Sequence, residues 1–89
     1  MYVFYQDLKY NIFILIKDKF MITINQIQIR LIETIQQSGM TQKKIADIIK
    51  ISQQTVSHYI KGRNLPALDT LANLCKLLDV DTNYILCQD

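Results

Sequence analysis

Apolar residues recur every three or four positions through most of the chain after residue 22, which is the spacing of a helix with one buried face. The first stripe consists of Ile24, Ile27, Leu31, Ile32 and Ile35. Thr23, followed three residues later by Gln26, is the pattern of a capping box at a helix start. Ser38 and Gly39 follow the stripe, and glycine is the usual residue just past a helix end. A helix is therefore predicted from about residue 24 to about residue 37.

The following segment predicts two short helices joined by a tight turn. The first covers about residues 42–49 with Thr41 as its cap, and the second about residues 53–61 with Ser52 as its cap. Threonine and serine favour such positions because their hydroxyl oxygen accepts a hydrogen bond from an otherwise unpaired backbone N–H. Ala46 is small enough to let the second helix cross close to the first.

Polar side chains occupy the outer face of the second helix of this pair, while Val56 and Tyr59 direct its other face into the core. The polar residues are Gln53, Gln54, Ser57 and His58. Hydrogen-bonding side chains on the first turns of an exposed helix are what contact with base edges in a DNA major groove requires. On most helices such residues are simply solvated surface, so the turn and the apolar spacing around them decide this interpretation.

The C-terminal third of the chain predicts two further helices. Pro66 marks the entry to the first of them. Its apolar stripe consists of Leu68, Leu71, Ala72, Cys75 and Leu78, with Leu74 and Leu77 flanking it. Asp79 and Val80 break this helix, and Asp81 caps a last short one. The last helix contains Tyr84, Ile85 and Leu86. Residues 23–89 therefore predict one all-α domain of five helices.

Many of these residues fall into a single register, in which threonine and glutamine open the first helix of the pair and an apolar residue with alanine follows. The positions are Thr41, Gln42, Ile45, Ala46, Ile49, Ile51, Ser52, Val56, Tyr59, Gly62 and Pro66. The series resembles the Cro and phage-repressor (XRE-type) helix-turn-helix family over roughly residues 25–87. The resemblance implies a lambda-repressor-like domain and a sequence-specific DNA-binding transcriptional regulator, a repressor that binds a palindromic operator as a homodimer. The alternative is an antitoxin or a protein-interaction module with the same fold, whose partner would be a toxin or another protein.

The resemblance also implies which side chains contact double-stranded DNA. Base contacts fall on Gln53, Gln54 and His58, with Ser57 as a weaker candidate. Contacts to the DNA backbone fall on Gln42, Lys43, Lys61, Arg63 and Asn64. In the family, the residue equivalent to Gln42 also braces the first residue of the second helix, here Gln53. Base contacts supply specificity, whereas phosphate contacts supply affinity and register.

The turn between the paired helices departs from the family at one position, because Lys50 stands where the family has glycine. Glycine adopts a left-handed backbone without steric cost, while a residue with a side chain loses about 1 kcal/mol there. Lysine is tolerated at that cost. We therefore expect the turn to form with a left-handed Lys50.

Positive charge is concentrated around the helix pair, although the 89 residues carry a formal net charge of only +2. Residues 38–66 contain five basic residues and one aspartate, whereas residues 67–89 contain four aspartates and one lysine. A local excess of positive charge is what phosphate binding requires. The distribution therefore agrees with a nucleic-acid partner.

The sequence offers no chemistry typical of an enzyme and no cofactor motif. It has no paired carboxylates, no nucleophile with a neighbouring base, and only two glycines, too few for a phosphate-binding loop. Cys75 lies in an apolar stripe and is predicted to be a core residue, while Cys87 is predicted to be a free thiol. With His58 as the single histidine, these side chains cannot supply the four ligands of a structural zinc site. Neither catalysis nor metal binding is expected.

Residues 1–22 differ from the rest, since six of the eight aromatic residues lie there and nothing in the segment resembles the family. Three interpretations compete: an extended arm or hairpin that pairs with a partner subunit, a leader, or sequence upstream of a true start at Met21. A membrane-surface anchor is a weaker interpretation because the segment carries two aspartates and only three lysines. The start lacks a secretory signal, and the apolar run at residues 12–16 is far shorter than the about 20 residues that span a bilayer. No membrane contact and a cytoplasmic location are therefore expected.

Overall fold

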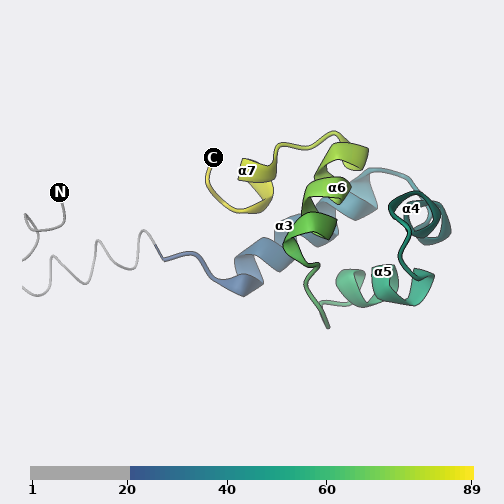
Figure 1. Cartoon of the computed structure of the whole chain (residues 1–89). Helices are drawn as coiled ribbons and strands as arrows, with labels where there is room; N and C mark the ends of the chain where they lie inside the picture. Colours follow the sequence, from purple (N-terminus) through teal and green to yellow (C-terminus); the bar gives the residue numbers. More distant parts are fainter. Residues whose placement is uncertain (1–20) are drawn as a thin grey trace, which may run out of the picture.

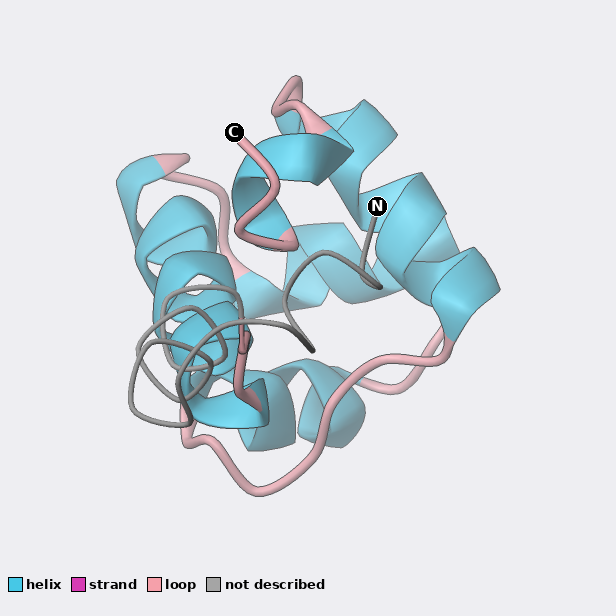
Figure 2. Cartoon of the chain, turned by 90° about the vertical axis from the view of Figure 1, so that its left-hand side faces the viewer, coloured by secondary structure: helices cyan, strands magenta, loops and turns pink. Residues whose placement is uncertain are grey.

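The computed structural model describes residues 21–89, and every regular element in this range is a helix (Figures 1 and 2). The helices are α3 (Ile24–Gln37), α4 (Gln42–Ile49), α5 (Gln53–Ile60), α6 (Leu68–Leu78) and α7 (Thr82–Ile85). The predicted five-helix, all-α domain is thus confirmed. The interpretations of the N-terminal extension fall on residues that lie outside the described range, apart from its last two.

The central element of the fold is α3, which packs against α5 and α7, while α4 packs against α5 and α6. In Figure 1, α5 and α7 lie on opposite sides of α3. None of the helices in residues 21–89 has the length and apolar character needed to cross a membrane.

The predicted starts of α3, α4 and α5 are confirmed by their hydrogen bonds. Thr23 and Gln26 form a complete capping box, in which each side chain accepts from the backbone N–H of the other, at 3.3 and 2.9 Å. The Thr41 hydroxyl accepts from the N–H of Lys44 at 3.1 Å, and the Ser52 hydroxyl accepts from that of Thr55 at 3.0 Å. Each bond satisfies a donor that the first turn of a helix leaves unpaired.

Left-handed residues follow all five helices, the last of them being Cys87 after α7, with a φ angle of 60°. Gly39 and Gly62 have φ angles of 74° and 72°, and Lys50 and Asp79 have φ angles of 67° and 54°. The left-handed backbone expected at Lys50 is therefore confirmed. At this turn the N–H groups of Lys50 and Ile51 both donate to the carbonyl oxygen of Ala46, at 2.8 and 3.1 Å, which closes the end of α4.

Three predicted helix limits are wrong by one or two residues. Pro66 does not begin α6: the N–H of Leu71 donates to the carbonyl of Ala67 at 2.8 Å, so that extended Ala67 is the cap and the helix starts after it. The helix α5 ends one residue before Lys61, and Leu86 lies just beyond α7. The terminal residues of helices fray, and the spacing of apolar residues alone does not locate the exact helix boundaries.

The core is formed by ten buried residues drawn from all five helices. They are Leu31, Ile35, Ile45, Ala46, Val56, Tyr59, Leu71, Leu74, Cys75 and Ile85. The predicted stripe of α6 is rotated: Leu68 is 83% exposed, whereas Leu74, expected only to flank the stripe, is fully buried. The face that packs on α4 is set by Leu71, Leu74 and Cys75, which are spaced by three and four residues. Cys75 is a core residue, as predicted.

Arg30 connects α3 to the C-terminal end of the chain. Its Nη1 atom donates to the carbonyl oxygen of Tyr84 and to Oδ1 of Asp89, each at 2.7 Å. The guanidinium carbon also lies 4.5 Å from the centre of the Tyr84 ring, within the range of a cation–π contact. These bonds lower the pKa of the Asp89 carboxyl, since the hydrogen bond from Arg30 favours its charged form.

Candidate nucleic-acid interface

The position of α5 is determined by the side chains that it buries. Val56 is fully buried and Tyr59 is only 6% exposed, and both belong to the core. The opposite face is left outside, so that Gln53 and Gln54, on the first turn after the Ser52 cap, are exposed to solvent. Their amides are free to exchange hydrogen bonds with a molecule placed against this turn.

Ser57 and His58 lie further along α5 and are half-buried, so they are less accessible than the two glutamines. The Nδ1 atom of His58 lies 3.4 Å from the side-chain amide nitrogen of Asn64. This contact joins the last turn of α5 to the loop that follows it. Two residues predicted to contact different parts of DNA are therefore neighbours, one on the helix and one on the loop.

The other residues predicted to contact the DNA backbone lie at two places around α5. Lys61, Arg63 and Asn64 are exposed in and beside the loop after the helix. Gln42 is half-buried at the first residue of α4, and the neighbouring Lys43 is exposed. The structure thus places cationic side chains beyond the end of α5 and at the start of α4.

Lys43 is partly engaged by a neighbouring acid, since its Nζ lies 3.8 Å from Oδ2 of Asp47 one turn later on α4. Both side chains are at least 70% exposed, and such surface pairs contribute little to stability. Lys43 can therefore exchange this partner for a phosphate. No hydrogen bond joins the side chains of Gln42 and Gln53 in the described part of the chain, so the brace implied between them stays a prediction.

The loop after α5 is closed by backbone hydrogen bonds and by one long-range contact. The N–H of Gly62 donates to the carbonyl of Tyr59 at 3.1 Å, and the N–H of Arg63 donates to that of His58 at 2.9 Å. The side-chain amide of Gln28, on α3, donates to the carbonyl of Gly62 at 3.2 Å. Sequence reasoning misses Gln28, and the available signal is weak: a polar residue placed directly beside the apolar stripe of the first helix.

A family model described as "Helix-turn-helix" matches residues 31–85, which is more than half of the chain. The chain belongs to the Cro and phage-repressor (XRE-type) helix-turn-helix family of DNA-binding regulators. Over 60 residues it is 38% identical to the HTH-type transcriptional regulator ImmR of Bacillus subtilis (strain 168). That match covers 67% of this chain and 47% of the relative, so the chain spans about half the length of this protein. No solved structure gives a significant match.

In this helix-turn-helix, α4 and α5 are the two helices of the motif and Lys50 provides the left-handed turn. The exposed first turn of α5 corresponds to the part of the motif that enters a major groove. The lysines and the arginine of residues 38–66 are all exposed, so that positive charge surrounds the two helices of the motif.

Within residues 21–89 no group of three or more histidine, cysteine, aspartate or glutamate side chains is placed to hold a metal ion. Both cysteines are free thiols, Cys75 buried and Cys87 half-buried.

Proposed function

We propose that the chain is a sequence-specific DNA-binding transcriptional regulator, which represses by occupying a palindromic operator as a homodimer. The observation that carries this proposal is the exposed first turn of α5, whose orientation is held by buried Val56 and Tyr59. A helix with its polar first turn exposed and cations beyond its other end is suited to enter the major groove.

Base contacts are assigned to Gln53 and Gln54, with Ser57 and His58 as further candidates. Glutamine can donate to N7 and accept from the N6 amino group of adenine as a bidentate pair, which gives it a preference among bases. Both glutamines are exposed, whereas Ser57 and His58 are half-buried and therefore less accessible to a base.

Contacts to the DNA backbone are assigned to residues on both sides of α5. They are Gln42, Lys43, Lys61, Arg63 and Asn64. The first residues of α4 add unpaired N–H groups and the positive end of the helix dipole, which favour a phosphate. These contacts supply affinity on any DNA and hold α5 in register on the operator.

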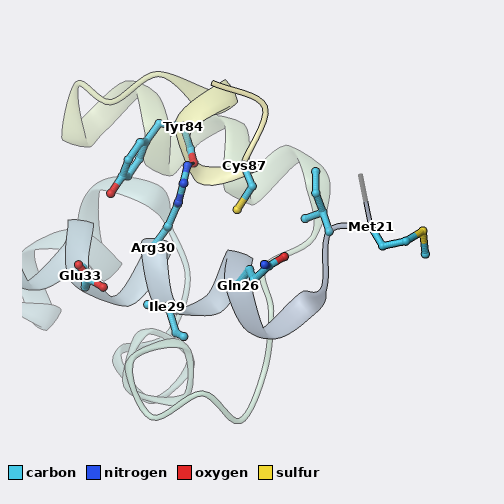
Figure 3. A pocket seen from close by; sticks show the side chains of 8 residues that line it. Met21, Gln26, Ile29, Arg30, Glu33, Tyr84 and Cys87 are labelled. Carbon is cyan, nitrogen blue, oxygen red and sulfur yellow. Dashed lines mark hydrogen bonds between the residues drawn. The ribbon is translucent and has the colours of Figure 1, made fainter. Parts of the chain in front are cut away.

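The homodimer follows from the size of the interface. One recognition helix contacts only a few base pairs, and two copies spaced by about 34 Å would double the contacts. A shallow depression of about 420 Å³ between α3 and α7 offers a surface for the second copy (Figure 3). Three of its lining residues, Met21, Ile29 and Tyr84, are 56%, 47% and 37% exposed. Gln26, Arg30 and Glu33 also line the depression, so that exposed apolar side chains lie beside polar ones, as they do on many interaction surfaces.

Selection of bound sequences from a random pool of DNA duplexes tests the central proposal. We expect one enriched motif that is an inverted repeat, with half-site centres about one helical turn apart. Binding should weaken steeply with added salt because phosphate contacts release counterions. Failure to enrich any sequence, or binding that is insensitive to salt, would refute the proposal.

Two substitutions on the surface test the dimer. Ile29→Glu places a charge in the depression between α3 and α7, and Ile48→Glu does the same on α4 at a residue of nearly equal exposure, 47% against 48%. Sedimentation of both variants should give a monomer for the first and a dimer for the second. Equal behaviour of the two would place the dimer contact elsewhere, and a chain that begins at Met21 would then show whether residues 1–20 provide it.

A protein-interaction module, such as an antitoxin, is the second candidate function. The same depression favours it, since a toxin or another protein could occupy the surface that we assign to a second copy. A monomer that fails to select any DNA sequence would favour this candidate over the repressor.

A further inference from the structure

The peptide group between Gly62 and Arg63 is held from both of its sides. Its carbonyl oxygen accepts a hydrogen bond from the side-chain amide of Gln28 at 3.2 Å. Its N–H, which belongs to Arg63, donates to the carbonyl oxygen of His58 at 2.9 Å. One side of this peptide is therefore tied to the last turn of α5, and the other to α3, 34 residues earlier in the chain.

Both bonds are needed to fix the direction in which the chain leaves α5. A peptide group is planar, so that the positions of its oxygen and its N–H together define its orientation. The preceding residue, Gly62, has a φ of 72° and no side chain, which gives this peptide a wide choice of alternative orientations. The backbone bond to His58 ties only one side of it. The bond from Gln28 removes the remaining freedom.

The residue whose position depends most directly on this peptide is Arg63. The side chain of Arg63 starts from the Cα atom at the end of the tied peptide, and the side chain is exposed. Asn64 follows, and its amide lies 3.4 Å from the ring of His58. A rotation of the Gly62–Arg63 peptide would redirect Arg63 and withdraw Asn64 from His58. Gln28 lies on α3, which is the longest helix of the described chain and belongs to the core through Leu31 and Ile35.

We propose that Gln28 is a positioning residue for DNA binding, which touches no DNA itself and holds Arg63 in the orientation that meets a phosphate. The inference rests on the proposed DNA-binding function of α5 and its loop. It adds that the first helix of the domain tunes affinity for the DNA backbone through one side-chain amide.

The test uses Gln28→Met, which keeps the length of the side chain and removes both amide N–H groups. Gln36→Met is the matched control, because Gln36 is an exposed glutamine of the same helix. Binding of the full chain to a short duplex of random sequence is measured at several salt concentrations. We expect Gln28→Met to bind up to about tenfold more weakly at low salt and to reduce the salt slope by up to about 1, as loss of one phosphate contact would. Gln36→Met should bind like the unaltered chain.

A double-mutant cycle with Arg63→Ala separates positioning from a general structural effect. If Gln28 acts through Arg63, the double variant binds no more weakly than Arg63→Ala alone, because the contact is already absent. If the two losses add, Gln28 acts independently of Arg63 and the inference is wrong. Binding by Gln28→Met that equals that of Gln36→Met also overturns it.

DNA binding by the unaltered chain shows whether the proposed function or only this inference has failed. If that chain shows no salt-sensitive binding to DNA, the proposed function fails, and the inference fails with it. If it binds and only the cycle is additive, the function stands and Gln28 has no positioning role. Should Gln28→Met fail to fold, Gln28→Glu with Gln36→Glu as its control repeats the comparison, since glutamate is polar and supplies no N–H at neutral pH.

Discussion

Replacement of Lys50 by glycine should stabilise the domain. Lys50 has a φ of 67°, in the left-handed region where a side chain crowds the backbone, and its N–H and that of Ile51 both bond to Ala46. Lys50 itself is exposed and forms no ion pair with another described residue, so that its side chain contributes little to the fold. The substitution therefore relieves a backbone cost without removing a packed group.

The size of the effect follows from two opposing terms. A left-handed backbone costs a residue with a side chain about 1–2 kcal/mol, and glycine does not incur this cost. Glycine in turn gives the unfolded chain more conformational freedom, which lowers stability by about 0.4–1 kcal/mol. The difference between the midpoints of these two ranges is a net gain of about 0.8 kcal/mol, which for a domain of this size corresponds to a rise in melting temperature of about 3–6 °C.

Thermal unfolding followed by circular dichroism measures this gain. Lys44→Gly is the matched control: it removes another exposed lysine from within α4, where the backbone is helical, and should lower stability by about 0.5–1 kcal/mol. The residue after α6, Asp79, has a φ of 54°, so that Asp79→Gly should behave like Lys50→Gly. A lower melting temperature for Lys50→Gly would show that its left-handed backbone is not the source of strain.

Three further predictions concern the interface and the core. Gln54→Ala should lose about 1–3 kcal/mol on the selected operator and little on random DNA, whereas equal losses on both would exclude a base contact. Arg63→Ala should weaken binding to both DNAs alike and lower the salt slope by about 1, as titrations at several salt concentrations will show. Burial, followed by the charge of Asp69, raises the pKa of Tyr59 in the folded chain. Above a pH of about 10, Tyr59 therefore loses its proton more readily in the unfolded chain, and the free energy of unfolding falls as the pH rises. Tyr59→Phe should weaken this alkaline loss, measured as the melting temperature against pH, and an unchanged profile would assign the loss to another group.

The starts of α3, α4 and α5, and the turn between α4 and α5, could be predicted from the sequence because the interactions that determine them are local. The capping box of Thr23 and Gln26 spans three residues, and the caps at Thr41 and Ser52 do the same. The left-handed Lys50 is expected from the family resemblance, because Lys50 stands where the family has glycine. Such features depend on hydrogen bonds between near neighbours, which a linear pattern contains.

Features that depend on how helices meet could not be predicted from the same pattern. Leu68 and Leu74 are identical residues on one helix, yet one is 83% exposed and the other fully buried, because contact with α4 selects the face. Gln28 reaches Gly62 across 34 residues, and His58 meets Asn64 only after the loop has closed. The sequence pattern therefore predicts the exposed glutamines of the interface. The contacts that orient the loop after α5 become visible only in the folded structure.

The contact of α3 with α7 joins the two ends of the described chain, and this sets the order in which parts of the domain form. The paired helices α4 and α5 are neighbours in sequence, whereas closure of α7 on α3 must bring together residues about fifty positions apart, such as Arg30 and Tyr84. Closing a longer loop costs more conformational entropy, so we expect this contact to form after the pairing of α4 and α5. Because α7 has only four residues, it depends on buried Ile85 and on Arg30 for its place. A second copy bound over the α3–α7 depression would therefore bind the last-formed part of the fold and stabilise it, so that completion of folding and pairing become one concentration-dependent equilibrium.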